Sequence, residues 1–173
     1  MQKNAHSQKL AELVIPAITL VITFMAALAV YYQTQKYFTA ERTSYYIERF
    51  NSTELVEARE VVDNWLSTGE SPRDLYTRIK DRATESGKNG LFVYRNIRTF
   101  VNFFQELGVA MKHETLNEEY LWDVFGGLVL RYGNLLKPYI EETRIQLNRP
   151  KVLQEFTKLV ELMESLDKKY STK

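Results

Sequence analysis

The stretch LVIPAITLVITFMAALAVYY, residues Leu13–Tyr32, decides how this chain is built. It contains no charged side chain and no side-chain amide over twenty residues. An α-helix of that length is about 30 Å long, which matches the thickness of the hydrocarbon core of a bilayer. The stretch therefore predicts a helix that crosses a membrane.

A cleavable signal peptide is the main alternative for this stretch. Lys3 and Lys9 form a basic leader, and the sequence from Ala27 to Ala29 fits a small-x-small cleavage site. The apolar stretch is longer than the roughly 7–15 residues usual in such signals, which favours a retained span. A buried core helix is the second alternative, but it would need protein on every side, and the rest of the chain is too small to supply it.

Cations on the two sides of the span predict its orientation. Lys3 and Lys9 precede it, whereas Lys36, Arg42 and Arg49 follow it. Cytoplasmic flanks carry the excess of cations. We therefore expect a single-pass protein of the cell inner membrane with its C-terminal part in the cytoplasm.

Aromatic residues continue the helical pattern beyond the span. Tyr31 and Tyr32 suit the interface between lipid and water, where an apolar ring and a polar hydroxyl are both satisfied. Further aromatic residues then recur at helical spacing: Phe38, Tyr45, Tyr46 and Phe50. Residues 33–50 are therefore predicted to form a juxtamembrane stalk helix.

The composition of the chain indicates one folded domain besides the span, because 45% of its residues are apolar and 26% are charged. A net charge of +1 provides no overall field that would attract nucleic acid, so no nucleic-acid partner is predicted. The chain has no cysteine, which excludes disulfides, thiolate nucleophiles and Cys-ligated zinc. We expect no cofactor.

Residues 51–166 predict a compact domain of about six helices, so the fold class is all-α. Helix starts and stops follow from capping residues, prolines and glycines. The predicted helices cover 51–69, 71–87, 91–111 after a turn at Lys88–Gly90, 115–132 behind a capping box at Thr115–Glu118, a segment after Pro138, and a last helix opened by Pro150. Residues 1–12 are expected to be a short tail and residues 167–173 a flexible one.

Within the span, four residues share one helix face: Pro16, Thr19, Thr23 and Ala27. Small and hydroxyl side chains at such spacing let membrane helices approach closely and bond to each other. This face is a candidate for self-association. The alternative is that these residues simply face lipid.

In the domain, three residues are candidates for a structural role. Asn102 lies in the middle of an aromatic helix, where an amide either faces water or is buried and bonded to a neighbouring element. Gly126 and Gly127 interrupt a helix pattern, each at a cost of roughly 1 kcal/mol relative to Ala. Close contact with a neighbouring helix would account for that cost.

Residues that could carry chemistry are few. His6 lies in the N-terminal tail, and His113 is most simply a solvated loop residue without the Arg or Asn at the preceding spacing that a helical ribonuclease would need. Carboxylate pairs at helical spacing belong to polar helix faces: Glu57 with Glu60, Glu119 with Asp123, and Glu161 with Glu164. No catalytic or metal-binding residue is predicted, and the protein is expected not to be an enzyme.

Three stretches carry a resemblance to a known family: FNSTELVEAREVVDNWL (50–66), NFFQELGVAMKHETLNEEYLWDVFG (102–126) and PYIEETRIQLNRPKVLQEF (138–156). They resemble a bacterial family of functionally uncharacterised proteins with one N-terminal span and a helical domain. The resemblance implies membrane attachment and a helical fold, and it implies no activity, cofactor or substrate. In layout the chain is also similar to small pore-forming accessory membrane proteins of some CRISPR loci, which is an analogy of architecture alone.

These observations predict a membrane-anchored, non-enzymatic protein that acts through self-association or partner binding at the cytoplasmic face. The expected partners are the lipid bilayer, further copies of the chain as a homo-oligomer, and another protein as a further candidate. Two alternatives remain open. One is an oligomeric membrane effector or pore in a bacterial defence system, and the other is a helical ribonuclease without a recognisable motif.

Overall fold

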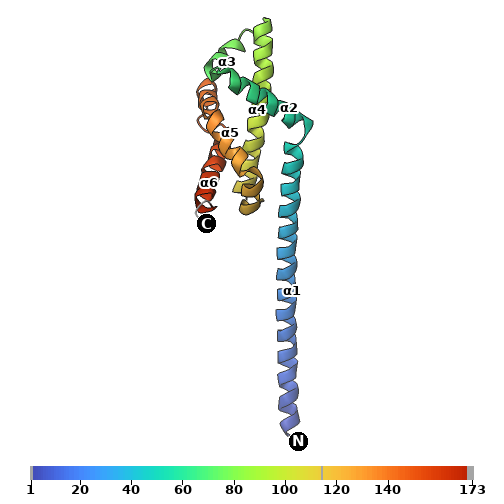
Figure 1. Cartoon of the computed structure of the whole chain (residues 1–173). Coiled ribbons are helices and arrows are strands. Elements are labelled where there is room, and N and C mark those ends of the chain that lie inside the picture. The colour runs from blue at the N-terminus through green and yellow to red at the C-terminus, as the bar shows by residue number, and fades with distance from the viewer. Residues whose placement is uncertain (1, 114, 171–173) are drawn as a thin grey trace. The chain divides into compact units, whose positions relative to one another are not determined.

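The computed structural model describes residues 2–113 and 115–170, with side chains from residue 16 onward (Figure 1). These residues form no strand and six helices: α1 (Gln2–Phe50), α2 (Thr53–Thr68), α3 (Pro72–Arg78), α4 (Glu85–Lys112), α5 (Glu118–Leu147) and α6 (Gln154–Tyr170). The predicted all-α fold class is confirmed. The chain divides into two compact units, Met1–Ala40 and Glu41–Lys173.

The first unit is the N-terminal part of α1, which Figure 1 shows as one unbroken helix. Pro16 lies inside α1 without ending it, and α1 already begins at Gln2, so the predicted tail is helical where it is described. The helix is long and apolar enough to cross a membrane, with a mean hydropathy of 1.6 in its most apolar part. Its large apolar side chains are exposed, from 37% at Leu28 to 73% at Leu20.

The last turns of α1 belong to the second unit. Thr43, Tyr46 and Phe50 are buried there. The ring of Phe50 lies 5.5 Å from that of Phe103 and 5.6 Å from that of Phe125. The predicted boundary at residue 51 is therefore misplaced, because the aromatic residues at 46 and 50 contribute to the core of the domain rather than to a free stalk.

Aromatic rings on α4 hold the second unit together. Phe104 stacks on Phe156 of α6 with ring centres 5.0 Å apart, and Phe100 meets Tyr132 of α5 edge to face at 4.6 Å. Phe100, Phe103 and Phe104 have no exposed surface. Such ring pairs contribute about 0.5–1.5 kcal/mol each beyond the area that they bury. Helix α4 therefore contributes rings to the contacts with both α5 and α6.

Capping residues define the short helices as expected. Ser52 accepts a hydrogen bond from the backbone of Leu55, and Ser71, followed by Pro72, accepts one from Asp74. Gly69 ends α2 in the left-handed region with φ of 70°. Each of these features satisfies backbone groups that a helix end leaves without an intrahelical partner.

Helix α4 begins earlier than predicted, because its cap is Thr84, whose hydroxyl accepts from Gly87 N at 3.0 Å. The predicted stop at Gly87 and the turn at Lys88–Gly90 both lie inside α4. Their glycines serve close packing: a Cβ at Gly87 would lie 1.7 Å from the carbonyl oxygen of Asp81. Glycine is favoured both where a helix ends and where a helix packs tightly against another segment. The sequence alone therefore does not distinguish these two roles for Gly87.

Helix α5 is a single helix through Pro138, where a separate helix was predicted. Pro138 is exposed, so water can reach the backbone carbonyl that loses its partner there. Burial of Leu136, Tyr139 and Ile140 on either side of it holds the helix together. Asn117, not Thr115, caps α5, and its side chain accepts from Tyr120 N at 3.0 Å.

Helix α6 begins at Gln154 rather than at Pro150, because residues 150–153 form turns and Leu153 adopts a left-handed φ of 57°. The helix continues to Tyr170, so the predicted flexible tail from residue 167 is helical up to that residue. Tyr170 stacks on Trp122 of α5 with ring centres 6.1 Å apart.

Candidate functional site

The face predicted for self-association lies on the exposed part of α1. Pro16, Thr19, Thr23 and Ala27 are all exposed. The hydroxyl of Thr23 donates to the carbonyl oxygen of Thr19 at 2.9 Å, four residues earlier on the same helix. Since that bond uses its proton, the Thr23 hydroxyl could only accept a hydrogen bond from a second helix.

Asn102 is half-buried on α4. Its amide makes no hydrogen bond to any residue that the structure describes. The water-facing interpretation of Asn102 therefore agrees better with the structure than the buried tie to a neighbouring element. The polar residues that are buried in the described part of the domain are Thr43 and Thr143.

The two predicted close-packing glycines differ from each other and from the expectation. Gly126 is buried, but a Cβ there would meet the indole of Trp122 at 2.5 Å, on the same helix. A Cβ at Gly127 would have no atom within 4 Å. The predicted contact with a neighbouring helix is thus absent at Gly127, and at Gly126 the small residue makes room for Trp122 instead.

Close contact between helices occurs at two other glycines, Gly108 and Gly133. A Cβ at Gly108 would lie 2.3 Å from the backbone oxygen of Glu155, and one at Gly133 would lie 2.3 Å from a methyl group of Val160. Both contacts bring α6 against its neighbours. The helical period could have found them, since Gly108 lies four residues after the buried Phe104 and Gly133 four after the buried Val129. Gly127, two residues after Phe125, points away from that stripe.

A hydrogen-bonded chain of hydroxyls crosses the core beneath α3. The hydroxyl of Thr143 donates to the carbonyl oxygen of Tyr139 at 2.6 Å, so Tyr76, 2.9 Å away, donates to Thr143. The rings of Tyr76 and Tyr139 stack at 6.2 Å. Burial raises the pKa of both tyrosines above its ordinary value. These hydroxyls join α3 to α5 and stay protonated at neutral pH.

Two charged clusters fasten α2. The hydroxyl of Tyr132 donates to both carboxylate oxygens of Asp63, at 3.0 and 3.1 Å. Glu70 accepts from the indole of Trp65 at 3.1 Å and from the guanidinium of Arg78 at 2.6 Å. The first cluster joins α2 to the distant α5, and the second joins α2 to the following α3, which accounts for these polar groups structurally.

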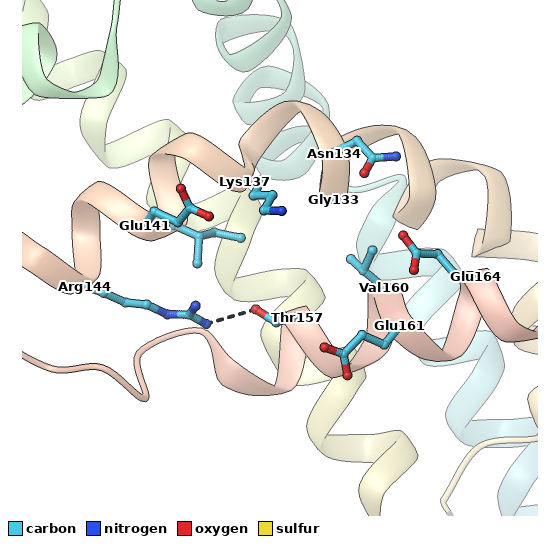
Figure 2. Close-up of a pocket in the computed structure, with 10 residues that line it drawn as sticks. Gly133, Asn134, Lys137, Glu141, Arg144, Thr157, Val160, Glu161 and Glu164 are labelled. Carbon is cyan, nitrogen blue, oxygen red and sulfur yellow. Dashed lines mark hydrogen bonds between the residues drawn. The ribbon is translucent and has the colours of Figure 1, made fainter.

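A groove of about 250 Å³ lies between α5 and α6 (Figure 2). Arg144 on its floor donates through Nε to the carbonyl of Val152 at 2.9 Å and through Nη2 to the hydroxyl of Thr157 at 3.0 Å. Figure 2 shows Lys137 and Glu141 on the α5 side and Glu161 and Glu164 on the α6 side. The two cations face three carboxylates, so the groove has no single charge that would select a ligand.

A second, wider groove of about 450 Å³ lies between α2 and α4. Val61, Asn64 and Thr68 line its α2 side, and Asn89 and Phe92 line its α4 side. The buried Trp65 belongs to its floor, whereas the ring of Phe92 is 55% exposed. The ion-paired Glu70 and Arg78 complete the lining. An exposed aromatic ring beside a buried indole is typical of a contact surface.

Titratable side chains do not gather into a metal site in the part of the chain that the structure describes. His113 caps the end of α4 and is exposed, whereas His6 lies outside the described side chains. The carboxylates of Glu57, Glu60, Glu119 and Asp123 are exposed or half-exposed on their helices. At Glu155 burial opposes ionisation, but the hydrogen bond from Lys158 and the charge of Lys112 outweigh this and hold the pKa of Glu155 below the usual value.

One family matches nearly the whole chain. Its description is "Domain of unknown function (DUF4760)", and the match covers residues 15–163, from the apolar part of α1 to α6. No curated protein and no solved structure matches the chain. Because the match includes both the apolar helix and nearly all of the helical domain, the chain belongs to the DUF4760 family of uncharacterised domains.

Proposed function

We propose that this protein is anchored in a membrane by a single span, residues 13–32, and that its helical domain acts by binding. In this proposal the protein lies in the inner membrane of a bacterial cell, with the domain on the cytoplasmic side. The domain binds further copies of the chain, or a partner protein, without catalysing a reaction.

The exposure of the apolar helix carries the proposal. Large side chains along one continuous helix, including Leu20, Ile22 and Phe24, are 62–73% exposed within the protein. A water-soluble chain rarely leaves so many contiguous apolar side chains in water, because each fully buried one would contribute roughly 1.5–3 kcal/mol. A bilayer removes them from water on all sides at once, and the helix satisfies its own backbone groups.

The part of the proposal that concerns binding is supported by how the polar side chains of the domain are used. Asp63, Glu70, Arg144 and Thr143 fasten helices to each other. These contacts leave the grooves between helices, and the exposed residues around them, as the surfaces at which a partner would be met.

Fractionation tests the anchor. The full-length chain should stay in the membrane pellet after carbonate or high-salt washing, with an intact mass that includes the N-terminus. Release by the wash, or a mature chain that begins at Val30, would contradict a retained span. Cleavage at that point would instead establish the signal-peptide alternative.

Protease tests the orientation. Added to intact cells or spheroplasts, it should leave the domain uncut, and it should digest the domain once the inner membrane is opened. Digestion from outside would place the domain on the opposite face. Light scattering of the detergent-solubilised protein tests self-association, and a monomeric mass would leave binding of another protein as the function.

A further inference from the structure

Exposed side chains of opposite charge flank the groove between α2 and α4, whose own charged lining residues, Glu70 and Arg78, pair with each other at 2.6 Å. Glu57 lies on the same side of α2 as the groove residues Val61, Asn64 and Thr68, at spacings of four, seven and eleven residues. With its exposed neighbours Glu54 and Glu60 it forms what is called here the acidic stripe. These three carboxylates make no ion pair with any described residue.

The α4 wall carries cations on both sides of an exposed ring. Lys88 and Arg95, called here the basic flank, lie four residues before and three residues after Phe92 and are exposed. Lys88 pairs with Glu85 at 2.6 Å, but both side chains are more than half exposed, and such a surface pair contributes little. Arg95 makes no ion pair with a described residue.

We infer that this groove is a contact surface between two copies of the chain. An acidic wall beside a basic wall is self-complementary: a two-fold axis through the groove sets the acidic stripe of each copy against the basic flank of the other. The exposed rings of Phe92 then pack over Trp65 and Val93 of the opposite copy, and the charges form the polar rim. The net charge of only +1 leaves little overall repulsion between copies.

The inference rests on the proposed membrane attachment, because attachment is what makes the contact between two copies strong enough to form. A groove of this size supplies less surface than the roughly 1,600 Å² of a standard interface, so the contact would be weak in solution. Attachment to one membrane confines the copies and raises their effective concentration, which lets a weak contact form dimers.

The chain has no cysteine, so a single introduced one reports the contact cleanly. Asn89 lines the groove and is exposed, and it lies close to the two-fold axis in this arrangement. The full chain with Asn89→Cys, reconstituted in phosphatidylcholine vesicles and oxidised mildly, should form a disulfide-linked dimer. Ile145→Cys is the control, because Ile145 is 71% exposed on α5 and lies outside the groove. It should cross-link about tenfold less.

Charge reversal then tests the pairing. In the Asn89→Cys background, Glu57→Lys with Glu60→Lys makes both walls positive, and Lys88→Glu with Arg95→Glu makes both walls negative. Each variant alone should lose cross-linking about tenfold, because like charges then meet twice. An equal mixture of the two, carrying different tags, should form the mixed dimer at the level of the parent, since every pair is again opposite in sign.

Two results would overturn the inference. One is cross-linking of either reversed variant at the level of the parent, and the other is a mixture that fails to recover. The reversed residues lie outside the apolar stretch and are exposed, so membrane retention and the circular dichroism spectrum should stay unchanged. Loss of the parent chain from the membrane fraction would instead contradict the proposed anchor, which keeps the two failures apart.

Discussion

The apolar part of α1 and the core of the helical domain use similar side chains in opposite ways. Leu20 and Ile22 of α1 are 73% and 63% exposed, whereas Phe103 and Phe104 of α4 are fully buried. The residues around Phe104 alternate with polar ones at the helical period, but the stretch from 13 to 32 has no polar face. Hydropathy indicates that a side chain must leave water, and periodicity indicates whether protein or lipid receives it.

The largest effect is expected from Phe104→Ala. Phe104 contacts Phe156, Phe100 and Phe103, so truncation leaves a cavity between α4 and α6 and should lower the free energy of unfolding by about 3–5 kcal/mol. Urea unfolding followed by circular dichroism measures it. The variant should remain in the membrane fraction. Its loss from the membrane would mean that attachment depends on the folded domain, and the comparison above would fail.

Ile22→Arg is the matching change in α1. An arginine in the middle of a span costs about 2.5–3.5 kcal/mol on insertion, so a large part of the protein should leave the membrane pellet. Ile22→Leu, which keeps the apolar character, should behave like the parent. The unfolding curve of the domain should not change in either variant, because Ile22 is 63% exposed and contributes nothing to the core. A shift of that curve would show that α1 is stabilised by protein contacts.

Two glycine substitutions should change the free energy of unfolding in opposite directions. Gly108→Ala places a Cβ 2.3 Å from the backbone of Glu155, so α4 and α6 must separate, and the free energy of unfolding should fall by about 1–3 kcal/mol. A Cβ at Gly127 would have no atom within 4 Å, and Gly127→Ala removes the flexibility of a glycine in a helix. This substitution should therefore raise the free energy of unfolding by about 1 kcal/mol. Equal effects in thermal or urea unfolding would show that the contact with Glu155 is not as close as described.

An effect confined to alkaline pH is expected at Tyr139. Burial raises the pKa of Tyr139 in the folded domain above the ordinary value of 10.0, so only the unfolded chain loses this proton as the pH rises past about 10. Stability is therefore full below that pH and falls above it, by about 1.4 kcal/mol per pH unit for each such tyrosine. Tyr139→Phe should make this fall less steep in unfolding curves measured between pH 9 and 11. An unchanged slope would mean that the hydroxyl reaches water.

The helix content and the core of the domain were predictable because both follow from local signals. Gly69, Ser71 and Pro72 mark helix ends, and Phe100 and Phe104, one turn apart on α4, are both fully buried. Errors arose where one residue type serves two purposes. Gly87 was interpreted as a stop and Pro138 as a helix start, yet both lie inside helices whose tertiary contacts decide the outcome.

The groove between α2 and α4 could not be predicted from local sequence signals. Its residues come from positions 61–70, 78 and 89–93, and only tertiary packing brings them together. The carboxylates Glu57 and Glu60 were correctly placed on a polar face, but their position beside the groove depends on how α2 packs against α4. The arrangement of charged side chains around a groove depends on tertiary structure, so it can be seen only once both helices are packed together.

The contact between Gly133 and Val160 constrains how this family can diverge. The Val160 side chain occupies the space that a Cβ at position 133 would need, so the two positions share one volume. A lineage that acquires alanine at 133 should carry alanine or glycine at 160, and the order of the two changes matters because the first must be the loss of bulk at 160. The contact at Gly108 offers no such exchange, since a backbone oxygen fills that space and no substitution can remove it. Position 108 should therefore stay glycine while 133 and 160 drift together.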